Sequence, residues 1–250
     1  MTEWPEGYGR RVLVEVDSTN AEAARMAADL AGPTWILGLK LTAGHGRRGG
    51  VWSHPEGNFA GSLVMRPAAQ ASEMAKRSFV AALALHDALS EVTGQGARFS
   101  LKWPNDILLN GGKVAGILLE SAGGPGGIIS HIAIGMGVNL AAAPDVGEVE
   151  AWATRPVSLL SETGVLVTPE EFLDVLAPAF ARWEAQIATY GFEPIRTAWL
   201  ARAAKIGEVI TARTMREEWT GTFETVDNAG NLVLKTAQGV VAIPAADVFF

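Results

Sequence analysis

The alternation of apolar and polar residues over the first 204 positions predicts strands interleaved with helices. Strands appear as two-residue alternation or short apolar runs, and helices as apolar positions three or four residues apart. The expected strands cover 11–16, 35–41, 59–66, 98–102, 106–110, 113–121 and 128–137, with a hairpin turn at 111–112. The expected helices cover 21–30, 72–92, 170–190 and 194–204, the first opened by a capping box of Thr19 and Glu22.

The pattern changes near Lys205, where only short alternating segments follow. They cover 208–213, 219–226, 232–236 and 240–243, and turn signals at 227–230 and 238–239 separate them. Short strands at this spacing are typical of a small β-barrel. We therefore predict an α+β fold: a mixed β-sheet with flanking helices over 1–204, and a small all-β domain over 205–250.

Composition narrows the class of protein. The chain has 250 residues, of which 48% are hydrophobic and 19% charged, so it is expected to fold into one sizeable core with room for a small second domain. The net charge of −7 argues against a nucleic-acid surface, and the absence of cysteine excludes disulfides and thiolate chemistry. The polar first ten residues do not resemble a signal peptide, and the apolar stretch 128–143 reads as a buried strand rather than a membrane span. We expect a cytoplasmic protein.

The segment 42–58 is a long loop rich in glycine, and loops of this length in a compact domain are usually functional. Gly44, Gly46 and Gly49 match the spacing of a dinucleotide fingerprint, but no helix can begin in the Trp-Ser-His-Pro-Glu-Gly run at 52–57, so we reject that interpretation. The remaining interpretation is a loop that binds phosphate through Arg47 and Arg48, with Trp52 covering the ligand. The alternative is a solvated surface turn.

A second candidate segment runs from Lys102 to Asp106 and continues across the predicted hairpin to Lys113. Two lysines and a carboxylate suit a metal-bound nucleotide beside a second anion, with Asp106 as a possible Mg²⁺ ligand. The alternative is an ordinary hairpin with exposed lysines. The spacing of the four histidines matches no zinc signature.

Five segments in this order resemble the biotin protein ligase family. They are Asp17-Ser18-Thr19-Asn20, the 44–52 loop, Lys102-Trp103-Pro104-Asn105-Asp106, Lys113-Val114-Ala115-Gly116-Ile117-Leu118 and Gly135-Met136-Gly137-Val138-Asn139. The resemblance implies a class II synthetase-like biotin/lipoate ligase fold over 1–204 as the catalytic domain that binds biotin and ATP. It also implies an SH3-like barrel over 205–250. We expect the short form, without the family's winged-helix DNA-binding domain.

The resemblance implies a two-step reaction. The carboxylate of biotin attacks the α-phosphate of ATP in the presence of Mg²⁺, giving biotinyl-5′-AMP and pyrophosphate. A lysine of a biotin carboxyl carrier domain then attacks the mixed anhydride and releases AMP. Two anions must be held together in the first step, and cations reduce that cost.

The resemblance also implies a role for each matching residue. Lys113, Arg47 and Lys102 would be catalytic, with Lys113 bridging the biotin carboxylate and the α-phosphate. Biotin would be bound by Ser18, Thr19, Gly44, Gly116 and Gly135. The nucleotide would be bound by Arg47, Arg48, Trp52, Asn105, Asp106 and Asn139, and Mg²⁺ by Asp106.

Three loop residues depart from the family's usual pattern. Leu41 stands where a glutamine usually contacts biotin, His45 replaces an arginine with a side chain that is mostly neutral at pH 7, and Gly50 replaces another arginine. A polar partner left unpaired costs about 1–3 kcal/mol. We therefore expect this chain to retain biotin or its adenylate more weakly than is usual in the family.

Two other functions stay open at this point. A ligase or transferase for lipoate or octanoate would share the fold, and Leu41 makes the pocket less polar, but the Lys102–Asp106 run and the Ser18-Thr19 pair favour biotin. A non-catalytic binder of biotin or biotinyl-AMP has less need of both Lys113 and Asp106. A homodimer and a monomer are both compatible with the sequence, and the role of the 205–250 domain is open.

Overall fold

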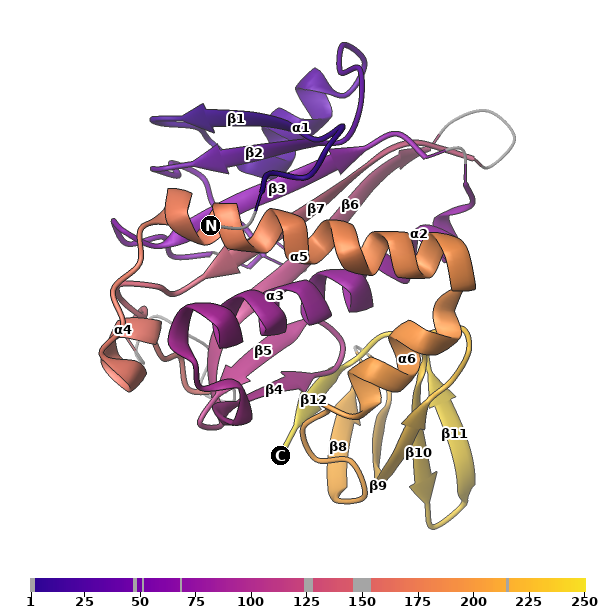
Figure 1. The fold of residues 1–250 in the computed structure, drawn as a ribbon. Coiled ribbons are helices and arrows are strands. Elements are labelled where there is room, and N and C mark those ends of the chain that lie inside the picture. The colour runs from indigo at the N-terminus through magenta and orange to yellow at the C-terminus, as the bar shows by residue number, and fades with distance from the viewer. Residues whose placement is uncertain are drawn as a thin grey trace.

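The computed structural model describes residues 3–46, 49–50, 52–67, 69–123, 128–145, 154–214 and 216–250, and it contains two sheets (Figure 1). The larger is seven-stranded and mixed, in the order β1-β2-β3-β7-β6-β5-β4. Its strands are β1 (Gly9–Leu13), β2 (Thr34–Gly38), β3 (Phe59–Met65), β4 (Phe99–Lys102), β5 (Asp106–Leu109), β6 (Gly112–Gly123) and β7 (Ile129–Val138). β1 and β2 run parallel, and the other neighbours run antiparallel.

The helices cover the two faces of this sheet unequally. α3 (Arg77–Thr93) and α5 (Pro169–Tyr190) lie side by side across one face, and α1 (Thr19–Met26) packs on the other (Figure 1). Strand alternation supplies both contacts, because successive side chains point to opposite faces. In β2, Trp35 and Leu37 join the large core under α3 and α5, whereas Ile36 joins the small cluster under α1. One face is therefore filled by long helices, and the other keeps room beside a short one.

The main core under α3 and α5 is dense and aromatic. Phe180 of α5 meets Trp35 edge-on with ring centroids 5.8 Å apart, and Phe172 meets Phe59 in the same way at 5.2 Å. All four side chains are fully buried. Edge-to-face pairs stabilise beyond the burial of area alone, so this layer is expected to carry most of the stability of the fold.

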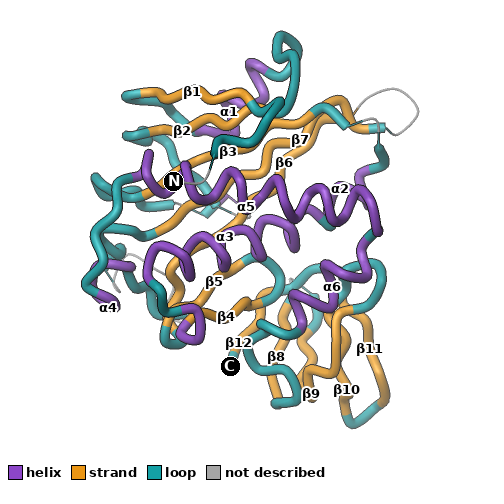
Figure 2. The backbone as a smooth tube through the Cα atoms, in the orientation of Figure 1, coloured by secondary structure: helices purple, strands orange, loops and turns teal. Residues whose placement is uncertain are grey.

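The second sheet is five-stranded and antiparallel, in the order β11-β10-β9-β8-β12 (Figure 2). Its strands are β8 (Val209–Arg213), β9 (Glu218–Val226), β10 (Leu232–Thr236), β11 (Gly239–Ile243) and β12 (Asp247–Phe249). The Trp103 indole N–H donates to the carbonyl of Gly230 at 3.1 Å. α6 (Phe192–Leu200) lies between this sheet and the rest of the molecule, with Phe192 and Trp199 edge-on to Phe79 of α3.

The structure confirms the predicted fold class, and the predicted strands agree with it to within a few residues. The predicted helix over 72–92 is two helices, α2 (Ala71–Ala75) and α3, separated at Lys76. The pattern missed α4 (Leu159–Thr163) and β12, because segments of five and three residues are too short to show a period. The boundary between 204 and 205 stays a prediction.

The expected capping box of Thr19 and Glu22 is wrong. Ser18 is the N-cap of α1, and its side chain accepts from the amide of Ala21. Thr19 is already the first helical residue, and Glu22 pairs with Arg25 one turn further on. The cap lies one residue earlier than expected, and the helix begins at 19 and not at 21, because Ser18, in extended conformation, reaches the free amides of the first turn.

The expected hairpin turn at 111–112 is also shifted by one residue. The turn residues are Asn110 and Gly111, with φ of 51° and 80°, whereas Gly112 pairs with Leu109 inside the hairpin. A two-residue turn of this hand needs positive φ at both positions, which asparagine and glycine tolerate best. Gly112 serves another purpose, because a Cβ there would lie 2.4 Å from Val157.

Within the described residues, no helix is long and apolar enough to cross a membrane.

Truncating the aromatic core should be costly. Phe180→Ala removes a fully buried ring and its partner contact with Trp35, and we expect the free energy of unfolding to fall by about 3–5 kcal/mol. Urea unfolding measures it. Leu166→Ala, at a side chain 76% exposed, is the control and should change little. A loss below about 1 kcal/mol for Phe180→Ala would contradict the assignment of stability to this core.

Candidate functional site

A cavity of about 500 Å³ opens on the α1 face of the large sheet. It brings together ten of the thirteen residues predicted from the sequence to have a catalytic or binding role, from loops and strands far apart in the chain. These are Ser18, Thr19, Gly44, Trp52, Lys102, Asn105, Asp106, Lys113, Gly116 and Gly135. Arg47 and Arg48, predicted to bind phosphate, lie outside the described residues.

Strand pairing creates the floor of the cavity. One row of paired residues crosses five strands, from β4 through β5, β6 and β7 to β3, and all five members line the cavity: Lys102, Asp106, Gly116, Gly137 and Ala60. Paired residues in neighbouring strands point to the same face. The row therefore has charge at one end and small residues in its middle, which is the surface needed for a ligand that lies flat and carries an anionic end.

A β-bulge decides where Lys113 points. Lys113 and Gly116 are three residues apart, so regular alternation would put them on opposite faces of β6. The pairing shifts between Ile107 and Leu108, because Ala115 pairs with Ile107 but Lys113 pairs with Leu108, which leaves Val114 as the extra residue. Bulges redirect side chains in this way. Lys113 thereby reaches the cavity face, where its Nζ lies 2.7 Å from Oδ1 of Asp106.

The two lysines lie near the Asp106 carboxylate, and Asp247 of β12 adds a second carboxylate at the same end of the cavity. Lys102 is only 8% exposed, and its Nζ donates to the hydroxyl of Thr154 at 2.7 Å. Burial lowers the pKa of the Lys102 ammonium, and the nearby Lys113 ammonium lowers it further, whereas the Asp106 and Asp247 carboxylates oppose that shift. Two cations and two carboxylates thus meet at this end of the cavity. The arrangement therefore places two ammonium groups where an anionic group of a ligand can contact them.

Trp52 lies on the glycines of the central row. A Cβ on Gly137 would lie 2.4 Å from its indole ring, and one on Gly116 would lie 3.2 Å from it. The Lys113 ammonium stands 5.7 Å from the centroid of the Trp52 ring. Trp52 is held from the other side by the loop, since its amide donates to the carbonyl of Gly44. The side chain predicted to cover a ligand thus borders both the loop and the lysines.

The start of α1 supplies the polar wall at the other end of the cavity. Ser18, Thr19 and Asn20 are all nearly buried and all line it. Asp17 fixes their backbone: its carboxylate accepts from the amide of Ser18 and from Arg25, and the hydrogen bond from Arg25 is the main cause that lowers the pKa of Asp17 to about 2. The cavity therefore suits an anionic group at the lysines and a neutral polar group at α1.

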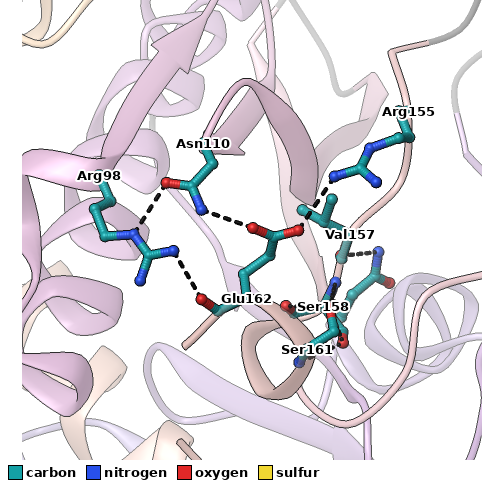
Figure 3. Close-up of polar contacts among 8 residues, drawn as sticks. Arg98, Asn110, Arg155, Val157, Ser158, Ser161 and Glu162 are labelled. Carbon is teal, nitrogen blue, oxygen red and sulfur yellow. Dashed lines mark hydrogen bonds and ion pairs between the residues drawn. The ribbon is translucent and has the colours of Figure 1, made fainter. Parts of the chain in front are cut away.

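Figure 3 shows how the segment from Arg155 to Glu162, which follows Thr154 in the chain, is held in place. The Glu162 carboxylate accepts from Asn110 at 2.6 Å and from Arg155 at 3.2 Å, and Arg98 donates to the carbonyl of Glu162 at 2.7 Å. The same segment adds to the edge of the hairpin, because Lys113 donates its amide to the carbonyl of Arg155. The cluster around Glu162 thus positions the backbone of one lysine and the hydroxyl partner of the other.

The two predicted asparagines have structural contacts. Asn105 donates its side-chain amide to the carbonyl of Ile117 at 2.7 Å, which ties the Lys102–Asp106 run to β6 at the cavity. Asn139 is buried, and its side-chain amide donates to the carbonyl of Val157 at 3.1 Å. It does not line the cavity, although Gly137, two positions earlier in β7, does. Its predicted contact with nucleotide stays a prediction.

Sequence reasoning missed several residues of the site. Thr154 gave no signal, because it stands alone between segments without a pattern. Asp247, Val248 and Phe249 of β12 also line the cavity, and the neighbouring Phe250 ring lies 5.0 Å from Nζ of Lys102. Their place depends on how the second sheet meets the first. Asn20 also lines the cavity, and its position directly after Ser18 and Thr19 was the one sequence signal that could have identified it.

The predicted metal ligand is compatible with Mg²⁺ but does not form a metal site alone. Asp106 offers a carboxylate beside Asn105 at the anion end, which is the oxygen chemistry that Mg²⁺ prefers. Among the described residues, no three histidine, aspartate or glutamate side chains are grouped to hold a metal ion. These residues therefore fit a metal that arrives with phosphate oxygens and water.

Comparisons with known proteins agree with this geometry. The model of the biotin/lipoate A/B protein ligase family matches residues 12–139, and that of the biotin protein ligase C terminal domain matches residues 205–250. The chain is 60% identical to the biotin–[acetyl-CoA-carboxylase] ligase of Paracoccus denitrificans over 240 residues, 96% of this chain and 99% of that protein. It is 32% identical to the bifunctional ligase/repressor BirA of Bacillus subtilis, over 94% of this chain and 72% of that protein.

Among solved structures, the fold is similar to that of a biotin protein ligase from Aquifex aeolicus in complex with biotin and ATP. The TM-score is 0.81 with 23% identity, and the match covers 96% of this chain and 97% of that one. This likeness extends over both sheets.

Removing the Thr154 hydroxyl should leave the buried Lys102 ammonium with one acceptor fewer. We expect the pKa of Lys102 to fall further in Thr154→Val, since the charged form loses a hydrogen bond, while Thr154→Ser should keep the wild-type value. A ¹³C NMR titration of reductively methylated lysines measures it, with Lys102→Arg assigning the signal. An unchanged Lys102 pKa in Thr154→Val would show that the hydroxyl does not hold the ammonium.

Proposed function

The chain belongs to the biotin/lipoate A/B protein ligase family, and on that premise we propose that it is an ATP-dependent biotin protein ligase. It joins biotin to ATP as biotinyl-5′-AMP and passes the biotinyl group to a lysine of a biotin carboxyl carrier domain. The observation that carries the proposal is a single cavity with a neutral polar wall at Ser18 and Thr19 and a lysine pair at its other end. A cyclic urea with a carboxylate tail needs both.

The lysines account for the first step. The biotin carboxylate and the α-phosphate repel each other, and Lys113 stands where it can contact both after exchanging its ion pair with Asp106. Lys102, held by Thr154, faces the same anions from β4. Mg²⁺, when bound, supplies further positive charge to the phosphate oxygens, and Asp106 would hold it. As the α-phosphate gains a bond to the carboxylate oxygen it loses the one to pyrophosphate, so its charge stays between these cations.

The flat middle of the cavity suits the fused rings of biotin. Gly116 and Gly135 present bare backbone there, and Trp52 lies against Gly116 and Gly137. Gly135 also gives Asn20 its place, because a Cβ there would lie 2.6 Å from the Asn20 amide oxygen. The roles of Gly44, Arg47, Arg48 and Asn139 in ligand binding remain part of this proposal.

The partner in the second step is the biotin carrier of a carboxylase, in agreement with the name of the Paracoccus protein. Its lysine amine attacks the acyl carbon of the adenylate, the bond to the phosphate oxygen breaks, and AMP leaves. The amine must be neutral to attack, and a cavity that opens to the surface lets it enter.

ATP–pyrophosphate exchange tests the first step with biotin, lipoate and octanoate in separate reactions containing Mg²⁺. We expect exchange with biotin only. Exchange with lipoate or octanoate alone would assign the chain to the other branch of its family, and binding of biotin without exchange would make it a non-catalytic binder.

Lys113→Ala should lower biotin-dependent exchange by about a hundredfold to a thousandfold, because the cation that joins the two anions is lost. Lys235→Ala, at an exposed lysine of β10, is the matched control and should exchange like the wild type. Exchange in Lys113→Ala within a few-fold of the control would remove Lys113 from the mechanism.

Leu41 lines the cavity without offering it a polar atom. Leu41→Gln should tighten biotin binding by about 5-fold to 150-fold, which corresponds to satisfying one buried polar group. Leu41→Met keeps the volume and adds no hydrogen-bonding group, so its biotin Kd should stay close to that of the wild type. Calorimetric titration measures the biotin Kd of the wild type and the two variants. An unchanged Kd for Leu41→Gln would mean that bound biotin has no polar group without a partner next to this position.

A further inference from the structure

We propose that a hydrogen-bond relay from Glu120 through Asn20 and Ser62 fixes the Thr19 hydroxyl as an acceptor, so that the cavity selects a ligand that presents a ring N–H. The inference rests on the proposed function and extends it, because it names the positioning residues that give the biotin site its hydrogen-bond polarity. None of the three touches the reacting atoms.

The first step of the relay fixes the Asn20 amide. Its Nδ2 donates to Oε2 of Glu120 at 2.8 Å and to the carbonyl of Leu118 at 3.2 Å. A carboxylate and a backbone carbonyl accept hydrogen bonds and cannot donate them. The amide nitrogen must therefore face β6, which turns Oδ1 of Asn20 toward β3.

The second step uses the single proton of Ser62. Its Oγ lies 2.6 Å from Oδ1 of Asn20 and 2.7 Å from Oγ1 of Thr19. Because an amide oxygen can only accept, Ser62 must donate its proton to Asn20. The short contact between the two hydroxyls then requires Thr19 to donate to Ser62, and the remaining lone pair of Thr19 is what the ligand meets.

Burial makes this polarity stable. Ser62 is fully buried, and Asn20 and Thr19 are 5% and 7% exposed, so water cannot readily replace a lost partner. The strand register holds the geometry as well: Ser62 pairs with Gly135, and Gly135 pairs with Leu118, in the row next to the charged one. Reversing the direction of any hydrogen bond in the relay leaves two buried oxygens facing each other with no proton between them, which is costly in a low-dielectric interior.

Ser18 completes the pattern with the opposite polarity. Its Oγ accepts from the amide of Ala21, so its proton is left to donate. Adjacent hydroxyls then offer one donor and one acceptor, which is the complement of the carbonyl and the neighbouring N–H of a cyclic urea. The site would reject a ring that has an oxygen in place of that N–H, because two acceptors would then face each other.

The test compares biotin with its two cyclic carbamate analogues, in each of which one ring N–H is replaced by oxygen. Calorimetric titration gives the three Kd values for the wild type, Ser62→Ala, Asn20→Ala and the double variant. In the wild type we expect one analogue to bind about a hundredfold more weakly than biotin. In Ser62→Ala the Thr19 hydroxyl is free to turn, so this ratio should fall to less than about tenfold.

Asn20→Ala should lower the ratio in the same way, because Ser62 can then donate to Thr19. The double variant should add nothing further, since both changes break one relay. Glu120→Ala leaves the Leu118 carbonyl to orient Asn20, so its effect should be smaller. Ser130→Ala, an exposed serine on β7, is the control and should keep the wild-type ratio. Thermal unfolding of each variant confirms that it folds.

The outcomes separate the relay from the proposed function. If the wild type binds no biotin, the proposed function fails. If it binds biotin but Ser62→Ala and Asn20→Ala weaken biotin and both analogues by the same factor, these residues only support the structure and the relay is overturned. An unchanged ratio in either variant overturns it as well. A selective fall of the ratio, without additivity, supports it.

Discussion

The register of β6 against its two neighbours is the constraint on which the site depends. This strand lines the cavity from Lys113 at the charged end to Leu118 near the start of α1, and a slip of one residue would turn its side chains to the opposite face. The bulge that leaves Val114 without a partner on β5 is part of that register, since it brings Lys113 onto the same face as Gly116 and Asp106. The pairing of strands, more than any single contact, places the charges.

The two faces of the large sheet divide stability and function between them. The face under α3 and α5 is filled by fully buried aromatic and aliphatic side chains, such as Trp35 and Phe180. The other face carries glycine, alanine and serine in its central strands, which weakens local strand preference but leaves space for a ligand. There two lysines stand close together beside the carboxylates of Asp106 and Asp247. The core on one side stabilises a sheet whose other side is shaped for binding.

Much of this protein follows from the sequence by itself. Apolar residues at every second position located the strands, and apolar residues three or four positions apart located the long helices, because both patterns are set by local burial. The five matching segments located ten cavity residues, because the glycine loop, the Lys102–Asp106 run and the Ser18-Thr19 pair each display their chemistry within a few consecutive positions. Where local signals were weak or shared by neighbours, as at the cap of α1 and the 110–111 turn, the prediction was one residue off.

Only the tertiary structure decided the contacts between segments that are distant in the chain. Thr154 reaches Lys102, and the residues of β12 reach the same cavity, through packing that no local pattern encodes. The polarity of Thr19 likewise depends on Ser62, 43 positions away. A sequence specifies which residues can form an element and which chemistry they carry. Which of them meet depends on register, bulges and the docking of one sheet on another, and these are settled by the free energy of the whole fold.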